Sequence, residues 1–158
     1  MKSFQVDEIG SLEGYVKQAI REYKPFRILR NLNFLYTWKL GDPKYDKDGL
    51  PIEASVKKLP TRERDLYGKD VELCVHFDSW DTLPKAQAYK LIFRTLLGIH
   101  VEVSGGEKLE LVLDDDGRII FHIVPPDIII KMFSTELEKF GMPSRYKHTV
   151  RLLTRKEE

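Results

Sequence analysis

The apolar residues of this chain follow helix-like and strand-like patterns in an order that does not repeat. Residues 12–23 and 84–98 carry apolar side chains three and four positions apart, which is typical of amphipathic helices. Residues 31–38, 50–59 and 71–77 instead have the aromatic, branched or alternating pattern of strands. Strands in blocks around a few helices predict an α+β fold with a small mixed or antiparallel sheet and two or three packed helices.

The second half of the chain continues the same mixture. Residues 101–113 and 118–124 are predicted to be two strands joined by a tight turn at Asp115-Asp116-Gly117. A helix is expected over residues 127–140, because the pattern starts at an aspartate and stops before a glycine. Residues 149–153 are expected to form a short closing strand.

Composition excludes several classes of protein. Lysine and arginine (26) nearly balance aspartate and glutamate (25), so no global field attracts nucleic acid or an anionic membrane. The single cysteine, Cys74, excludes an internal disulfide and a cysteine-based zinc site, and its apolar surroundings predict a buried, inert thiol. The start of the chain lacks the apolar core of a signal peptide, and no apolar stretch is long enough to span a membrane. We therefore expect a cytoplasmic protein.

Amide side chains are scarce. The chain has two asparagines and three glutamines against many lysines, arginines and glutamates. Proteins of high-temperature organisms tend to show this bias, so a thermophilic source is expected; chance in a short chain is the alternative.

Several features between about residues 26 and 141 together resemble the putative phage metallopeptidase family, a group of small zincin-like proteins. They are the strand at 32–38, the segment Ala54-Ser55-Val56-Lys57-Lys58-Leu59, a strand followed by Trp80, the helix at 84–98, the Asp-Gly hairpin and the Pro-Pro-Asp stretch. The resemblance implies a zincin-like minimal core over residues 26–158, preceded by an N-terminal helical extension over residues 1–25.

Members of that family look to carry an H-E-x-x-H motif on the helix, where two histidines four residues apart share one zinc ion and the glutamate polarises a bound water. Aligned without gaps, the two histidine positions fall on Arg94 and Gly98 and the glutamate position on Thr95. A later histidine position falls on Pro126. None of these residues is a zinc ligand, so the resemblance implies a degenerate active site, no catalytic residues, no cofactor and no enzyme activity.

A metal could still be held elsewhere. His100 and Glu102 lie two residues apart, on one face of a strand, and His122 lies on a strand that could pair with it. These three residues are weak candidates for a relocated metal site, and ordinary polar side chains on a sheet are the alternative.

If the site is empty, function should reside in a surface. The expected function is a protein-binding or regulatory module, with an origin in a virus or other mobile element. Its interaction surface would be the apolar residues Ile129, Ile130 and Phe133, for which burial in the core is the alternative. A nucleic-acid-binding surface that uses Arg27, Arg30 and Arg151 is a further possibility, as is a metal-dependent hydrolase with the relocated site.

Overall fold

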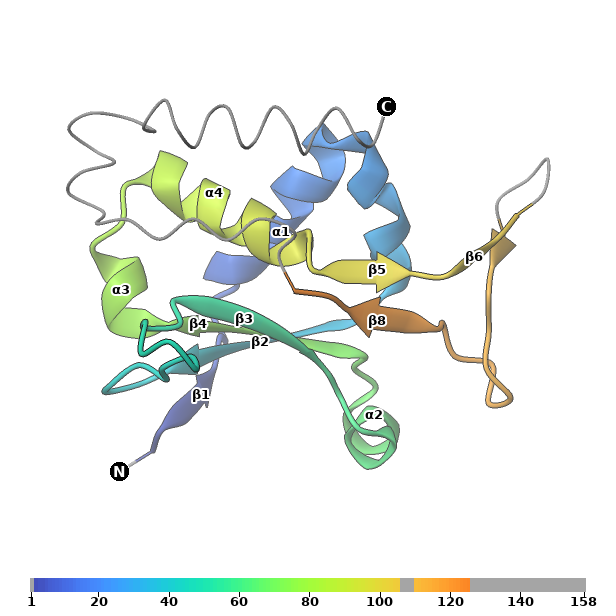
Figure 1. Ribbon diagram of the computed structural model, residues 1–158, viewed down its shortest axis with the longest axis horizontal. Helices are drawn as coiled ribbons and strands as arrows, with labels where there is room; N and C mark the ends of the chain where they lie inside the picture. Colours follow the sequence, from blue (N-terminus) through green and yellow to red (C-terminus); the bar gives the residue numbers. More distant parts are fainter. Residues whose placement is uncertain (1, 106–109, 126–158) are drawn as a thin grey trace. The chain divides into compact units, whose positions relative to one another are not determined.

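A four-stranded mixed sheet in the order β1-β2-β4-β3 forms the centre of the fold (Figure 1). The strands are β1 (Phe4–Val6), β2 (Phe34–Lys39), β3 (Ala54–Lys58) and β4 (Val71–His76). β2 and β4 run parallel in the middle, and β1 and β3 pair antiparallel to them at the two edges. This structure is a computed structural model, and it describes residues 2–105 and 110–125.

Two helices, α1 (Ser11–Glu22) and α4 (Lys85–Leu96), pack against each other on one side of the sheet (Figure 1). Each helix buries one stripe of its surface, and Leu12 and Val16 of α1 and Ile92 and Leu96 of α4 are at most 1% exposed. Both helices were predicted from the spacing of these residues, and both predictions are confirmed. The combination of a mixed sheet with packed helices also confirms the α+β class.

Alternation along β4 separates the two faces of the sheet. Val71, Leu73 and Val75 are fully buried in the core beneath the helices, while Glu72 and Cys74 lie between them in sequence and are half-buried on the opposite face. Successive strand residues point to opposite faces, so β4 contributes a dry inner face and a partly polar outer face.

A 3₁₀ helix, η1 (Lys24–Asn31), occupies most of the segment between α1 and β2. The strand predicted at 31–38 therefore begins later than expected, at Phe34. Two short helices, α2 (Thr61–Tyr67) and α3 (Phe77–Asp81), were also not predicted. They have seven and five residues, too few for an amphipathic pattern to separate them from a loop.

The predicted strand at 101–113 is wrong as a single element. It contains the last residue of β5 (Ile99–Val101), all of β6 (Val103–Ser104) and all of β7 (Glu110–Leu111), and β6 pairs with β7. Gly105 follows β6 directly, and glycine weakens a continuous strand.

The second predicted strand, at 118–124, is shorter than expected. Only β8 (Phe121–Ile123) is regular, and it pairs with β5. The tight turn at 115–117 is confirmed: the amide of Gly117 donates to the carbonyl of Asp114, and a bridge joins Leu113 to Ile119.

The first compact unit of the chain ends at Val124. The helix predicted at 127–140 and the strand predicted at 149–153 lie outside the described residues. In the described part of the chain, none of the helices has the length and apolar character that crossing a bilayer requires.

Candidate functional site

The three positions expected for the zinc motif, Arg94, Thr95 and Gly98, fall at the carboxyl end of α4. Arg94 is exposed in the last turn of the helix. Thr95 follows it, and its hydroxyl donates a 2.7 Å hydrogen bond to the carbonyl of Leu91, one turn back. Gly98 lies two residues beyond the last helical residue, Leu96. The second histidine position is therefore no longer on the helix face that a pair of ligands four residues apart requires.

Gly98 also lacks room for a side chain. A Cβ atom built on it would lie 3.3 Å from the carbonyl oxygen of Val124 and 3.4 Å from that of Thr95. The approach is close because the amide of Val124 donates a 2.8 Å hydrogen bond to the carbonyl of Gly98, which fixes the chain after β8 against the end of α4. A guanidinium, a hydroxyl bonded within its own helix and a glycine do not make a zinc site. The described residues at these positions do not fit the metal that the zincin motif would hold.

The strands β5 and β8 bring the three candidate metal residues onto one face. His100 and His122 are directly opposite each other in the antiparallel register. Glu102 lies two residues after His100, and its Oε1 accepts a 2.5 Å hydrogen bond from Nε2 of His122. The pairing of β5 with β8, which the sequence left open, thus brings His122 beside Glu102.

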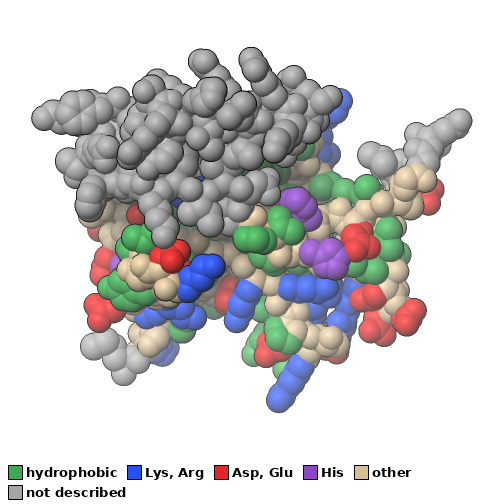
Figure 2. All heavy atoms as spheres, viewed as in Figure 1, with side chains coloured by type: hydrophobic (Ala, Val, Ile, Leu, Met, Phe, Trp, Pro, Cys, Tyr) green, Lys and Arg blue, Asp and Glu red, His purple; other side chains and the backbone are tan. Residues whose placement is uncertain are grey.

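This face is open to solvent. The side chains of His122 and Glu102 are 57% and 45% exposed. Figure 2 shows histidine side chains on the surface here, with lysine, arginine and acidic side chains nearby. Within residues 2–105 and 110–125, no three histidine, cysteine, aspartate or glutamate side chains are arranged to hold a metal ion. The arrangement is an exposed histidine–glutamate pair, with His100 as its cross-strand neighbour.

His76 is buried, and both of its ring nitrogens are engaged. Nε2 lies 2.6 Å from the carbonyl oxygen of Gly41, so it carries the proton and donates. Nδ1 therefore accepts, at 2.6 Å, from the hydroxyl of Ser79. A histidine held in this way is a structural link between β4 and the loop after β2.

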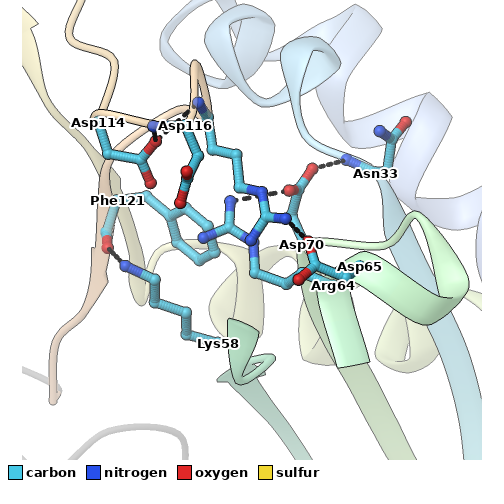
Figure 3. A network of polar contacts seen from close by, with 9 residues as sticks. Asn33, Lys58, Arg64, Asp65, Asp70, Asp114, Asp116 and Phe121 are labelled. Atoms are coloured by element: carbon cyan, nitrogen blue, oxygen red, sulfur yellow. Dashed lines mark hydrogen bonds and ion pairs between the residues drawn. The ribbon is translucent and has the colours of Figure 1, made fainter. Parts of the chain in front are cut away.

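A polar network on the other side of β8 holds this strand to the main sheet (Figure 3). Phe121 is fully buried, with the ammonium of Lys58 5.0 Å and the guanidinium of Arg64 5.6 Å from the centre of its ring. Arg64 also donates a 2.9 Å hydrogen bond to Asp70. The second carboxylate oxygen of Asp70 accepts from the backbone amide of Asn33. Arg118, from the turn before β8, forms an ion pair with Asp65 of α2. These contacts hold in place the strand that carries His122. They put no buried charge on the face that carries the histidines.

Cations line one side of η1. Lys24, Arg27 and Arg30 are all exposed, whereas Phe26 and Leu29 are buried. A 3₁₀ helix has three residues per turn, so residues three apart lie above one another. The three residues therefore form a row. Their Cα atoms are about 6 Å apart along the helix axis, given a rise of about 2 Å per residue. The sequence carries this signal as a period of three, which a search for helical or strand periods does not detect.

The remaining candidate positions lie outside the described residues. They are Pro126 of the motif, Ile129, Ile130 and Phe133 of the apolar surface, and Arg151 of the basic surface.

Comparison with known proteins identifies the family. The family model described as Putative phage metallopeptidase matches residues 7–154, nearly the whole chain. Compared with curated proteins and with solved structures, the chain has no significant match. The match begins before α1, so it includes the helix that the resemblance placed ahead of the family's region. The chain belongs to the putative phage metallopeptidase family.

Proposed function

We propose that this chain is a non-catalytic member of its family that works by binding a protein partner. The identity of the residues at the motif positions carries the proposal: Arg94, Thr95 and Gly98 supply neither ligands nor a general base. The close approach of the Val124 carbonyl to Gly98 supports it, because a side chain at this position would require that carbonyl to shift by a few tenths of an ångström. A family with a phage name also supports an origin in a virus or another mobile element.

Metal content and thermal stability test the first half of the proposal. The protein is purified without a histidine tag, its metals are counted by plasma mass spectrometry, and its melting temperature is compared with and without EDTA. We expect no stoichiometric zinc and no effect of EDTA, because a structural or catalytic metal contributes to folding free energy. About one zinc per chain, with destabilisation by EDTA, would contradict the proposal.

The triple variant H100A/E102A/H122A distinguishes a non-catalytic chain from a hydrolase with a relocated metal site. If the exposed histidine–glutamate pair and its neighbour hold a catalytic metal, the variant must lose both the metal and any peptidase activity. We expect the variant and the parent protein to be the same in metal content and both to be inactive on unfolded protein substrates.

The second claim, that the chain binds a protein partner, is tested by size-exclusion chromatography with light scattering and by cross-linking in lysate of the host. We expect a stoichiometric complex that the variant I129D/I130D/F133D no longer forms, since these three residues were expected to form an apolar surface. The exposed-surface variant K47D/R62D/K90D serves as the matched control, because it also introduces three aspartates. A chain that stays monomeric and retains no protein would contradict the proposal.

The row of cations on η1 favours nucleic-acid binding as a second candidate function. Lys24, Arg27 and Arg30 are exposed along one line, and no carboxylate in the described part of the chain forms an ion pair with them. Phosphate neutralisation makes affinity fall with salt, with a slope of about 0.9 per phosphate contacted. The variant K24A/R27A/R30A should reduce this slope by about 3, while K47A/R62A/K90A should leave it unchanged. Filter binding at several salt concentrations measures the slopes. A separate R151A variant tests the remaining candidate, and equal slopes in all of these proteins would exclude this function.

A further inference from the structure

The outer face of the central sheet, opposite α1 and α4, contains a hollow of about 180 Å³. It lies where the loop after β2 folds over β1, β2, β4 and β3. The residues that line it and bear on its chemistry are Phe4, Lys39, Lys44, Ile52, Lys57 and Cys74. We call this site the lysine hollow.

Two lysines converge on one aromatic ring at the lysine hollow. The ammonium groups of Lys39 and Lys44 lie 5.4 Å and 5.1 Å from the centre of the Phe4 ring. Lys39 donates one hydrogen bond to the carbonyl of Leu40, which leaves N–H donors unused on that group. Among residues 2–105 and 110–125, neither ammonium group has a carboxylate within ion-pair distance. Two positive charges beside one ring, without a counter-ion among the described residues, attract an anion.

The third lysine of the hollow does not share this property. Lys57 lies 3.6 Å from the carboxylate of Glu72, directly across from it on β4. Since that pair is neutral, the charge that remains in the hollow is the pair of positive charges on Lys39 and Lys44.

The floor of the hollow offers further polar groups. Cys74 is half-buried there, and Thr37 lies directly opposite it on β2. Thr37 is 5% exposed, and its hydroxyl lies beside the thiol of Cys74. Burial raises the pKa of the Cys74 thiol and the hydrogen bond with Thr37 opposes this rise; more weakly, the charge of Glu72 raises the pKa and the charges of Lys44 and Lys39 lower it. Both lysines are therefore near enough to the thiol to influence it.

The rim of the hollow is held in place. His76 lines it and bonds at 2.6 Å to the carbonyl of Gly41, at the start of the loop that carries Lys44. Its other ring nitrogen is held by Ser79 of α3. The loop is therefore attached to β4 by a buried side chain, and this attachment positions the lysine.

We propose that the lysine hollow binds a small organic anion. Its phosphate or carboxylate group lies between the ammonium groups of Lys39 and Lys44, and its apolar part lies against Phe4 and Ile52. The volume of the hollow suits a single small molecule. The apolar side chains and the unused lysine donors provide the combination of apolar walls and few polar groups that is typical of ligand sites.

Cys74 provides a direct test, because it is the only cysteine of the chain and lines the hollow. The rate of its alkylation by iodoacetamide, a neutral reagent, is measured against increasing phenyl phosphate, benzoate and inorganic phosphate, with potassium chloride at equal ionic strength as the reference. We expect saturable protection by the aromatic anions. A lower half-protecting concentration for phenyl phosphate than for benzoate identifies a phosphate ligand, and the reverse order identifies a carboxylate.

The variant K39A/K44A should raise the half-protecting concentration at least about tenfold, because each charge-assisted hydrogen bond contributes this much or more. The variant K47A/R62A removes two exposed cations elsewhere and should leave it unchanged. Protection is compared within each variant, and circular dichroism checks that each is folded. Protection no greater than that of potassium chloride, or equal protection in K39A/K44A and the parent protein, would overturn the proposal.

Discussion

At the scale of single residues, Arg64 shows how this fold accommodates a buried charge. It is 7% exposed, yet its guanidinium contacts both the carboxylate of Asp70 and the ring of Phe121. Asp70 in turn accepts from the amide of Asn33, so one carboxylate connects α2 to the starts of the parallel strands β2 and β4. The sequence around Arg64 contains four charged residues in a row of five, and nothing in that pattern marks one of them as buried.

We expect Arg64→Met to lower the free energy of unfolding by about 2–3 kcal/mol, because removing one partner of a buried ion pair leaves the other charge uncompensated. Urea denaturation measures the change. Arg62→Met is the matched control: Arg62 is exposed, and its replacement should change the stability by no more than about 0.5 kcal/mol. Equal effects of the two substitutions would show that the network around Asp70 contributes little.

Tyr36 predicts how stability depends on alkaline pH. Burial raises the pKa of its hydroxyl well above the usual value of about 10, and the negative charges of Glu13 and Asp7 raise it further. The folded state therefore retains a proton that the unfolded chain releases. The contribution is intact below about pH 10 and is lost progressively as the pH rises above that value.

Tyr36→Phe removes this titration, so the stability of the variant should fall less steeply than that of the parent between pH 9 and pH 11, a range set on either side of the usual pKa of about 10. Urea midpoints across this range measure the two slopes. The ring stacking of residue 36 on Phe34 is retained in the variant, so the comparison isolates the hydroxyl. Parallel pH profiles would contradict the assignment.

At the scale of secondary structure, η1 is the element with the most informative pattern. Buried Phe26, Leu29 and Leu32 alternate with exposed Lys24, Arg27 and Arg30 at a strict spacing of three. A period of three matches neither the 3.6 residues of an α-helix nor the two residues of a strand. No element was therefore predicted over residues 24–30, and Asn31 was predicted to begin a strand.

Gly98, just beyond α4, and Gly14, within α1, give opposite predictions. Gly98→Ala should destabilise the protein by about 1–3 kcal/mol, because the added methyl group meets the carbonyls of Val124 and Thr95. Gly14→Ala, within α1, should stabilise it by about 0.5–1 kcal/mol, since nothing lies within 4 Å of the added atom and alanine favours helix. Thermal or urea unfolding of both variants provides the measurement. A neutral Gly98→Ala variant would mean that β8 can move away from α4, and would weaken the argument drawn from the Val124 carbonyl.

At the scale of the whole molecule, composition predicts a melting temperature above the mesophilic range of about 45–65 °C. The chain has 51 charged lysine, arginine, aspartate and glutamate residues and few amides. The described ion pairs include Arg64–Asp70 and Arg118–Asp65, which connect separate elements. Pairs of this kind contribute more at high temperature.

Differential scanning calorimetry at low and at high salt tests this prediction. We expect unfolding above about 70 °C, with a decrease on addition of salt that reflects screening of the exposed pairs. A melting temperature within the mesophilic range would attribute the scarcity of amides to chance.

The sequence by itself determined the α+β class, the two long helices, the strand at β4 and the family. Periodic apolar positions and the segments that resemble the family are local properties of the chain. The sequence also placed His100 and Glu102 on one face of a strand, since side chains two residues apart share a face. That His122 lies opposite His100 depends on the pairing of β5 with β8, which the tertiary structure decided. The tertiary structure alone decided that residues 101–105 and 110–113 do not form one strand, that Arg64 is buried, and that Gly98 is pressed against Val124. It alone brought the ammonium groups of Lys39 and Lys44 to the ring of Phe4. These features depend on which distant segments meet, and distant contacts leave no period in the sequence.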